Sequence, residues 1–372
     1  MSDPTAHAAG GLPPDDPLRH ELHNEVHARP PARIQLPALV VFVAVLNEGV
    51  GRATEWEHLR QLPGQQDLVL DELAGNFVRL NLGSSTLKWE RHTEFTRYSI
   101  VLPLPAGTSL ADTTALHLDP AEVPADWLQR IPGRTVAAIR LAMVEAALPE
   151  ATPAAQARLM EPAARWFEGR TVVASQLGGG HSWAVTDFHL RPSGFEHMLV
   201  IAPPGTTATR AGRISQRLLE LETYRLMALR GLPVAKALGP TLAQAEQQLS
   251  VITAQLEGKA TSEQALLDAL VALAASVERA TAENVYRFAA TRAYDALVSQ
   301  RIHELREKPI PGTQTIGEFM QRRLSPAMAT VAASERRLTS LSERIARTSA
   351  LLRTRVDIVT AAQNQQLPAK PT

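Results

Sequence analysis

The sequence predicts an α+β head domain, with a mixed or antiparallel sheet and flanking helices, followed by an all-α stalk of long helices paired as a hairpin. Residues 17–210 alternate short strand-like and helix-like segments, whereas residues 211–366 are rich in the helix formers Ala, Leu, Gln, Glu and Arg. The composition changes at the same point, because residues 1–210 hold 17 basic and 23 acidic side chains and residues 211–372 hold 21 and 15. We therefore place the domain boundary after Arg210.

The overall composition excludes several classes of protein. With 372 residues and 45% hydrophobic side chains, the chain has enough apolar material for a buried core, which excludes global disorder. The absence of cysteine excludes disulfides and thiolate metal sites. The net charge is zero, and this balance argues against a nucleic-acid partner.

Neither a targeting signal nor a membrane span is expected. Residues 1–16 and 367–372 are expected to be disordered ends, and no basic segment followed by an apolar one opens the chain. The longest apolar run, Leu39–Leu46, is far shorter than the roughly 20 residues that a membrane helix needs. As written, the chain is expected to be soluble and cytoplasmic.

The head domain is expected to begin with a short amphipathic helix over residues 17–28. The Val-rich run Leu39–Leu46 suits a strand buried on both faces, although a buried helix has the same pattern. A helix over residues 55–62 and an alternating strand over residues 76–82 follow. The remaining expected elements before residue 170 are strand-like sequence over 87–102 and 136–144 and a helix over 154–167.

Three strands are expected to close the head as an antiparallel meander, over residues 170–177, 182–190 and 195–202. The connectors are turn sequences, Gly178-Gly179-Gly180-His181 and Arg191-Pro192-Ser193-Gly194. The three glycines do not indicate a phosphate-binding loop, because a strand rather than a helix follows them.

The stalk is expected to be an antiparallel helical hairpin. Nothing between Ser262 and Lys308 breaks a helix, and apolar residues recur there at the three- and four-residue spacings of a coiled coil. The same spacing returns at Leu338, Leu341 and Ile345, after a turn over residues 309–312. The alternative is an ordinary helical bundle packed against the head.

One polar stretch lies near the N-terminus, and its candidate site residues are Asn24, Glu25, His27 and Arg29. His20, His23 and His27 recur at helical spacing, which is acceptable geometry for the imidazole ligands of a divalent metal. The alternative is a row of solvated histidines on a surface helix.

A second polar stretch runs from Trp89 to Phe95. If it is one strand, Glu90, His92 and Glu94 project to one face, and with His27 they could hold a metal or act as an acid/base pair. The alternatives are an exposed sheet face, or a structural network of ion pairs with Arg29, Arg91 and Arg97 that docks the first helix. Asp187, which shares a strand face with His189, is a weaker candidate.

Several long motifs resemble a known family. They are Asn24-Glu25-Val26-His27-Ala28-Arg29-Pro30, Trp89-Glu90-Arg91-His92-Thr93-Glu94-Phe95, Thr186-Asp187-Phe188, Leu218-Leu219-Glu220-Leu221-Glu222-Thr223-Tyr224-Arg225, Arg353-Thr354-Arg355-Val356-Asp357 and Gln363-Asn364. The chain is identified by them as similar to an uncharacterised bacterial family, domain of unknown function 3422, described as membrane-anchored. The resemblance implies a cytoplasmic head and a hydrophobic anchor after the Gln-Asn motif, where this chain instead has residues 367–372.

Two functions are expected from these features. The first is a non-enzymatic ligand- or partner-binding head on a stalk that forms a homo-oligomer, with an architecture similar to that of CorA-like channels. The basic end of the stalk would then lie beside a membrane surface, and its arginines are Arg336, Arg337, Arg344, Arg347, Arg353 and Arg355. The second is a metal-assisted hydrolase that uses His27, Glu90, His92 and Glu94.

Overall fold

The computed structural model describes residues 15–25, 30–150, 152–258 and 262–366. The chain forms two compact units, one made of residues 1–147 and 189–216 and the other of residues 148–188 and 217–372. This division differs from the single boundary expected after Arg210, because residues 148–188 group with the helical part of the chain. The sequence pattern shows where a strand begins but not which strands and helices it packs against.

The first unit is built on a mixed sheet in the order β2-β3-β4-β1-β5-β8. All of its pairings are antiparallel except β5 with β8, which is parallel. The strands are β1 (Ala38–Leu46), β2 (Phe77–Leu82), β3 (Ser85–Arg91), β4 (Phe95–Pro103), β5 (Arg134–Glu145) and β8 (Glu196–Ala202). The expected strand over Leu39–Leu46 is confirmed as β1, whose nine residues are all buried.

The helices of the first unit are short. They are α1 (Arg19–Glu25) and α2 (Arg52–Leu59), and α2 follows β1 directly. A longer helix, α4 (Ala208–Leu229), begins in this unit and contains the division between the two units. Gly212 of α4 lies against the backbone of Ala32, and a Cβ at Gly212 would overlap the Ala32 carbonyl oxygen. The close approach explains why this helical position has no side chain.

The second unit contains the remaining elements. Its strands lie in the order β7-β6-β9, with β6 antiparallel to both neighbours. The β6–β7 pair of the expected three-strand meander is confirmed as antiparallel. The elements are α3 (Pro153–Arg165), β6 (Val173–Leu177), β7 (Ser182–Thr186), α5 (Gly231–Glu257), α6 (Glu263–Leu305), β9 (Lys308–Pro309), α7 (Ile316–Arg323) and α8 (Ser325–Gln366).

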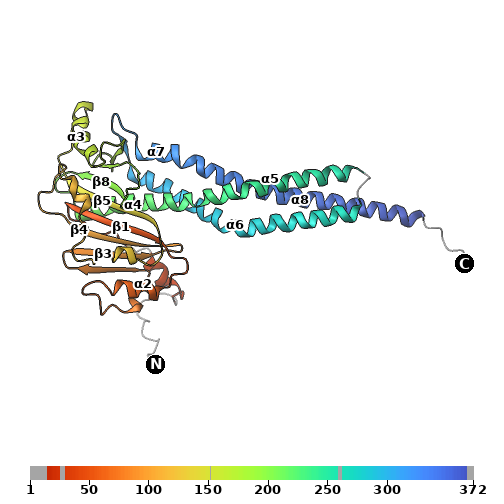
Figure 1. The fold of residues 1–372 in the computed structure, drawn as a ribbon, viewed down its shortest axis with the longest axis horizontal. Coiled ribbons are helices and arrows are strands. Elements are labelled where there is room, and N and C mark those ends of the chain that lie inside the picture. The colour runs from red at the N-terminus through yellow and green to blue at the C-terminus, as the bar shows by residue number, and fades with distance from the viewer. Residues whose placement is uncertain (1–14, 26–29, 151, 259–261, 367–372) are drawn as a thin grey trace, which may run out of the picture. The chain divides into compact units, whose positions relative to one another are not determined.

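Three helices, rather than a pair, form the long part of the second unit. α5 and α8 run in one direction and α6 in the other (Figure 1). Their apolar stripes share one core, which includes Leu242, Leu249, Leu270, Leu273 and Leu341. The apolar positions Leu338, Leu341 and Ile345 are buried, as expected. The hairpin expected from sequence paired α6 with α8 only and did not include α5.

The glycine turn between β6 and β7 binds backbone rather than phosphate. The amide of Gly178 donates to the carbonyl of Leu305 over 2.8 Å, and that of Gly179 donates to Arg306 over 3.0 Å. The turn thereby satisfies carbonyls that are left without partners where α6 ends. Within the described part of the chain, no helix combines the length and apolar character that crossing a membrane requires.

Candidate functional site

The second polar stretch is a hairpin rather than one strand. β3 ends at Arg91 and β4 begins at Phe95, so His92 and Glu94 lie in the connecting turn. The amide of His92 donates to the carbonyl of Phe95 over 2.8 Å, and the two rings stack with centroids 4.6 Å apart. The expectation of Glu90, His92 and Glu94 in one period-two row is corrected by this turn, which the sequence does not mark with Gly, Pro, Asn or Asp.

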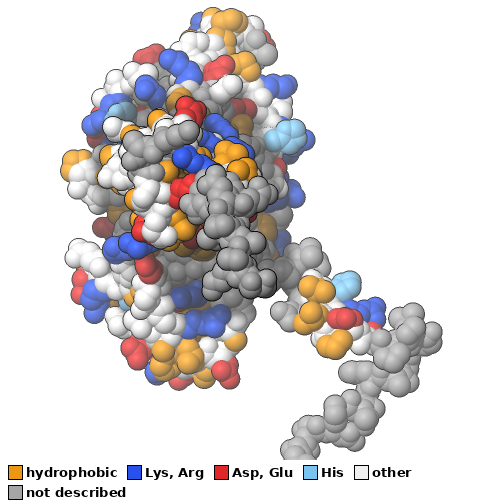
Figure 2. Space-filling view, turned by 90° about the vertical axis from the view of Figure 1, so that its right-hand side faces the viewer, with side chains coloured by type: hydrophobic (Ala, Val, Ile, Leu, Met, Phe, Trp, Pro, Cys, Tyr) orange, Lys and Arg blue, Asp and Glu red, His pale blue; other side chains and the backbone are white. Residues whose placement is uncertain are grey.

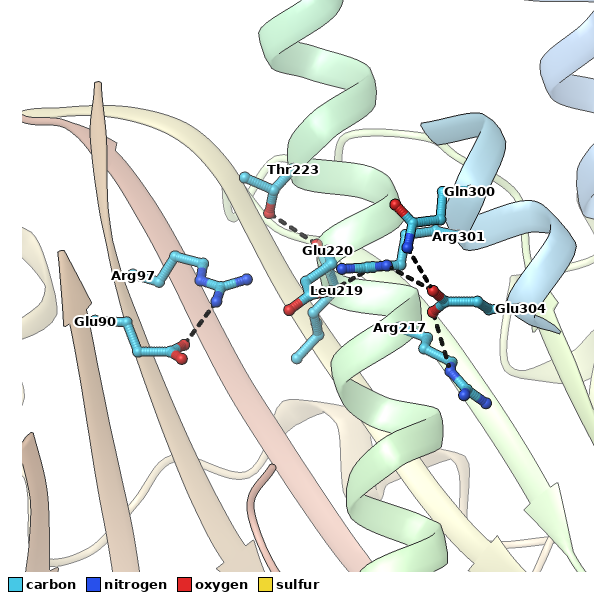
Figure 3. Close-up of polar contacts among 9 residues, drawn as sticks. All are labelled: Glu90, Arg97, Arg217, Leu219, Glu220, Thr223, Gln300, Arg301 and Glu304. Atoms are coloured by element: carbon cyan, nitrogen blue, oxygen red, sulfur yellow. Dashed lines mark hydrogen bonds and ion pairs between the residues drawn. The ribbon is translucent and has the colours of Figure 1, made fainter. Parts of the chain in front are cut away.

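Glu90 lies on one face of this hairpin. It stands opposite Arg97 in the β3–β4 register, and Arg97 Nη2 is 2.9 Å from Glu90 Oε2 (Figure 3). Lys88 Nζ is 3.1 Å from the same oxygen, and Glu90 is buried. Lys88 and Arg97 therefore both compensate the charge of the Glu90 carboxylate. The pairing with Arg97 is the one expected if this stretch forms a structural network of ion pairs.

Arg91 projects to the opposite face and pairs with α2. Its Nη1 lies 2.6 Å from Oε2 of the fully buried Glu55, and its Nη2 donates to the carbonyl of Val50 over 2.7 Å. Thr96 donates from Oγ1 to Glu55 Oε1 over 2.6 Å. Asn47 donates to Thr96 Oγ1 over 3.3 Å. We call Asn47, Glu55, Arg91 and Thr96 the Glu55 cluster.

An aromatic group lies one turn of α2 beyond Glu55. His58 stacks on Trp127 with ring centroids 4.2 Å apart, and Trp127 Nε1 donates to the His58 carbonyl over 3.0 Å. Burial, and then the positive charge of Arg130, lower the pKa of His58 to about 4. Burial, and then the negative charge of Glu55, raise the pKa of Tyr98, which meets His58 edge-on. Both side chains are therefore neutral near pH 7.

The chemistry of these groups is that of a packed structural network. Glu55 is held by a guanidinium and a hydroxyl, and the lowered pKa of His58 makes its imidazole a weak base. The described residues contain no group of three or more His, Cys, Asp or Glu that could hold a metal ion. The arrangement binds α2 to the sheet.

The N-terminal candidates are only partly described. Asn24 and Glu25 belong to α1, but their side chains lie outside the described residues, as do His27 and Arg29 altogether. The histidine row and the His27 contribution to a metal site stay predictions. Asp187 is buried directly after β7 in the second unit.

A second polar network, which no sequence pattern indicates, joins α4 to α6. Arg301 Nε lies 2.5 Å from Glu220 Oε2, and its Nη1 lies 3.0 Å from Glu304 Oε1 (Figure 3). Arg217 Nε lies 3.5 Å from Glu304 Oε2. Glu220 belongs to the long motif over residues 218–225, so part of that motif serves to join two helices.

The family described as "Protein of unknown function (DUF3422)" matches residues 14–370. The chain belongs to this family. No curated protein and no solved structure matches the chain.

Proposed function

We propose that this DUF3422 chain is a non-enzymatic assembly protein, in which the α+β unit binds a ligand or partner and the helical bundle self-associates. The supporting observation is the placement of exposed apolar side chains. Of the thirteen large exposed hydrophobic residues among the described ones, seven lie on the bundle helices: Val251, Val271, Val285, Tyr286, Leu351, Val356 and Ile358. Association that covers such side chains removes apolar surface from water, which favours self-association.

Sedimentation velocity of the full chain at one to one hundred micromolar tests this proposal. Self-association predicts a sedimentation coefficient that rises with concentration to that of an oligomer. A single monomeric species over the whole range would contradict it.

Location at the cytoplasmic face of a bacterial membrane forms part of the same proposal. Its support is the family resemblance together with exposed Arg336, Arg344, Arg347 and Arg353 on α8. Other arginines of α8 pair within the bundle, such as Arg337 with Glu246 at 2.8 Å. Figure 2 shows Lys and Arg interspersed with Asp and Glu on the visible face. Binding to anionic but not neutral vesicles tests the location, and equal binding to both would contradict it.

The metal-assisted hydrolase has less support. It requires His27, Glu90, His92 and Glu94 to converge. Glu90 is instead paired with Arg97 and Lys88, and His92 and Glu94 lie in the turn between β3 and β4. Metal analysis of the purified protein and of His92→Ala distinguishes the two functions. Stoichiometric metal that is lost in the variant would favour the hydrolase.

A further inference from the structure

The outer face of α5 carries no charge over most of its length. Between Ala237 and Leu256 the sequence holds one charged residue, Glu246, and this residue is paired with Arg337 of α8 through bonds of 2.9 and 2.8 Å. Every exposed residue in this stretch is uncharged. Twenty residues of helix extend about 30 Å, so the uncharged surface is long.

α6 continues the uncharged surface beside α5. From Ala265 to Val277 its one charged residue is Asp268, which accepts a hydrogen bond from Gln264 over 2.9 Å. Val251 of α5 is 49% exposed and Val271 of α6 is 59% exposed. We call the outward side of these two stretches the α5–α6 face.

A groove runs along the α5–α6 face. Its volume is about 690 Å³, and small or uncharged side chains line it, among them Gln244, Gln248, Ala269, Ala272 and Ser276. Small side chains allow a second helix to approach to the 8–10 Å typical of packed helices. The groove therefore suits another helix better than a small charged ligand.

The third helix of the bundle has a different surface. α8 carries nine charged residues between Ser325 and Gln366, and Arg336, Arg344, Arg347 and Arg353 are exposed. The exposed charges of α8 are well hydrated, whereas the α5–α6 face has few charged groups to hydrate. The difference between faces of one bundle indicates that the α5–α6 face is covered when the protein is assembled.

We propose that the α5–α6 face packs against the same face of a second copy, around a twofold axis. A twofold interface brings one surface onto itself, so the surface must be complementary to itself. The α5–α6 face comes close to this condition, because its one exposed charge is that of Asp268, one helical turn before Ala272. A charged partner would have to desolvate its own charges against this face. A 30 Å stretch of α5 and a 20 Å stretch of α6, each about 10 Å wide, offer on the order of 500 Å² per copy, which is about the lower limit for a specific interface.

Charge substitutions in the face test this inference, which rests on the proposed self-association. The double variant Ala269→Glu/Ala272→Glu places acidic groups at two exposed helical positions, and Glu is a good helix former. Like charges brought together should weaken association at least about tenfold. The control is Ala346→Glu, at an exposed position of α8. Circular dichroism of each variant verifies that the helices are retained.

Mixing variants of opposite charge tests the twofold geometry. Ala269→Lys/Ala272→Lys should also associate weakly alone, and an equimolar mixture with the Glu variant should recover the association of the wild type. The placement of the interface would be overturned if both double variants associated as strongly as the wild type. It would also be overturned if the mixture associated as weakly as each variant alone. Either result would leave self-association itself standing. A monomeric wild type would overturn both.

Discussion

Glu55 of α2 and Arg91 of β3 form a buried ion pair, with 2.6 Å between Oε2 and Nη1. The Glu55 side chain is fully buried and that of Arg91 is 18% exposed. Arg91 therefore anchors α2, while its neighbour Glu90 pairs with Arg97 on the other face. Two adjacent residues of one strand thus stabilise opposite sides of the sheet.

Removal of Glu55 should destabilise the first unit. Glu55→Ala leaves Arg91 and Thr96 without their shared partner, and loss of one member of a buried pair costs about 3 to 5 kcal/mol. Urea denaturation measures the change in the free energy of unfolding. Asp126→Ala is the control, because its pair with Arg130 is 3.1 Å long but more than half exposed, and it should cost less than about 1 kcal/mol. Equal losses in the two variants would contradict the anchoring role.

Stability should fall in mild acid because of His58. Its pKa lies at about 4 in the folded protein against an ordinary value of 6.5, so the unfolded chain binds the proton more readily. This contribution to stability is complete above the ordinary value and is lost as the pH falls toward 4, at up to about 1.4 kcal/mol per pH unit. Denaturation of His58→Gln should show a shallower slope between these pH values. The same slope in wild type and variant would exclude His58 as the cause.

Two glycines of α5 should respond differently to alanine. A Cβ at Gly231 would lie 2.3 Å from Thr291 Oγ1 of α6, whereas a Cβ at Gly239 meets nothing within 4 Å. Gly231→Ala should destabilise the bundle by about 1 to 3 kcal/mol through overpacking. Gly239→Ala should be close to neutral, because the helix propensity of Ala is opposed by the clash of its Cβ with the Cδ of Pro240. Thermal unfolding measures both, and a stabilising Gly231→Ala would show that α5 and α6 lie further apart.

Local features of the fold could be predicted from the sequence. β1 is apolar at every position, which predicts a buried element and favours a strand by its short length. The long helices keep three- and four-residue spacing, which predicts their type without knowledge of their partners. The turn at His92 could not be predicted, because it contains none of the usual turn residues. The place of α5 in the bundle is a matter of tertiary packing, which sequence periodicity does not specify.

The candidate site was less predictable than the fold. Glu90 and Arg91 attracted attention because they stand in a polar run. Glu55 stands alone in a short helix, and its link to Arg91 depends on how α2 lies on the sheet. Buried pairs between distant segments leave no periodic signal in the sequence.

The most direct test of the central claim is the mass of the full chain by light scattering, in 0.15 M and in 1 M NaCl. An uncharged interface predicts twice the chain mass of 40.4 kDa at both salt concentrations, because screening does not weaken apolar contacts. A dimer that dissociates in 1 M NaCl would place the interface on charged surfaces such as α8. A mass of one chain in both solutions would contradict self-association itself.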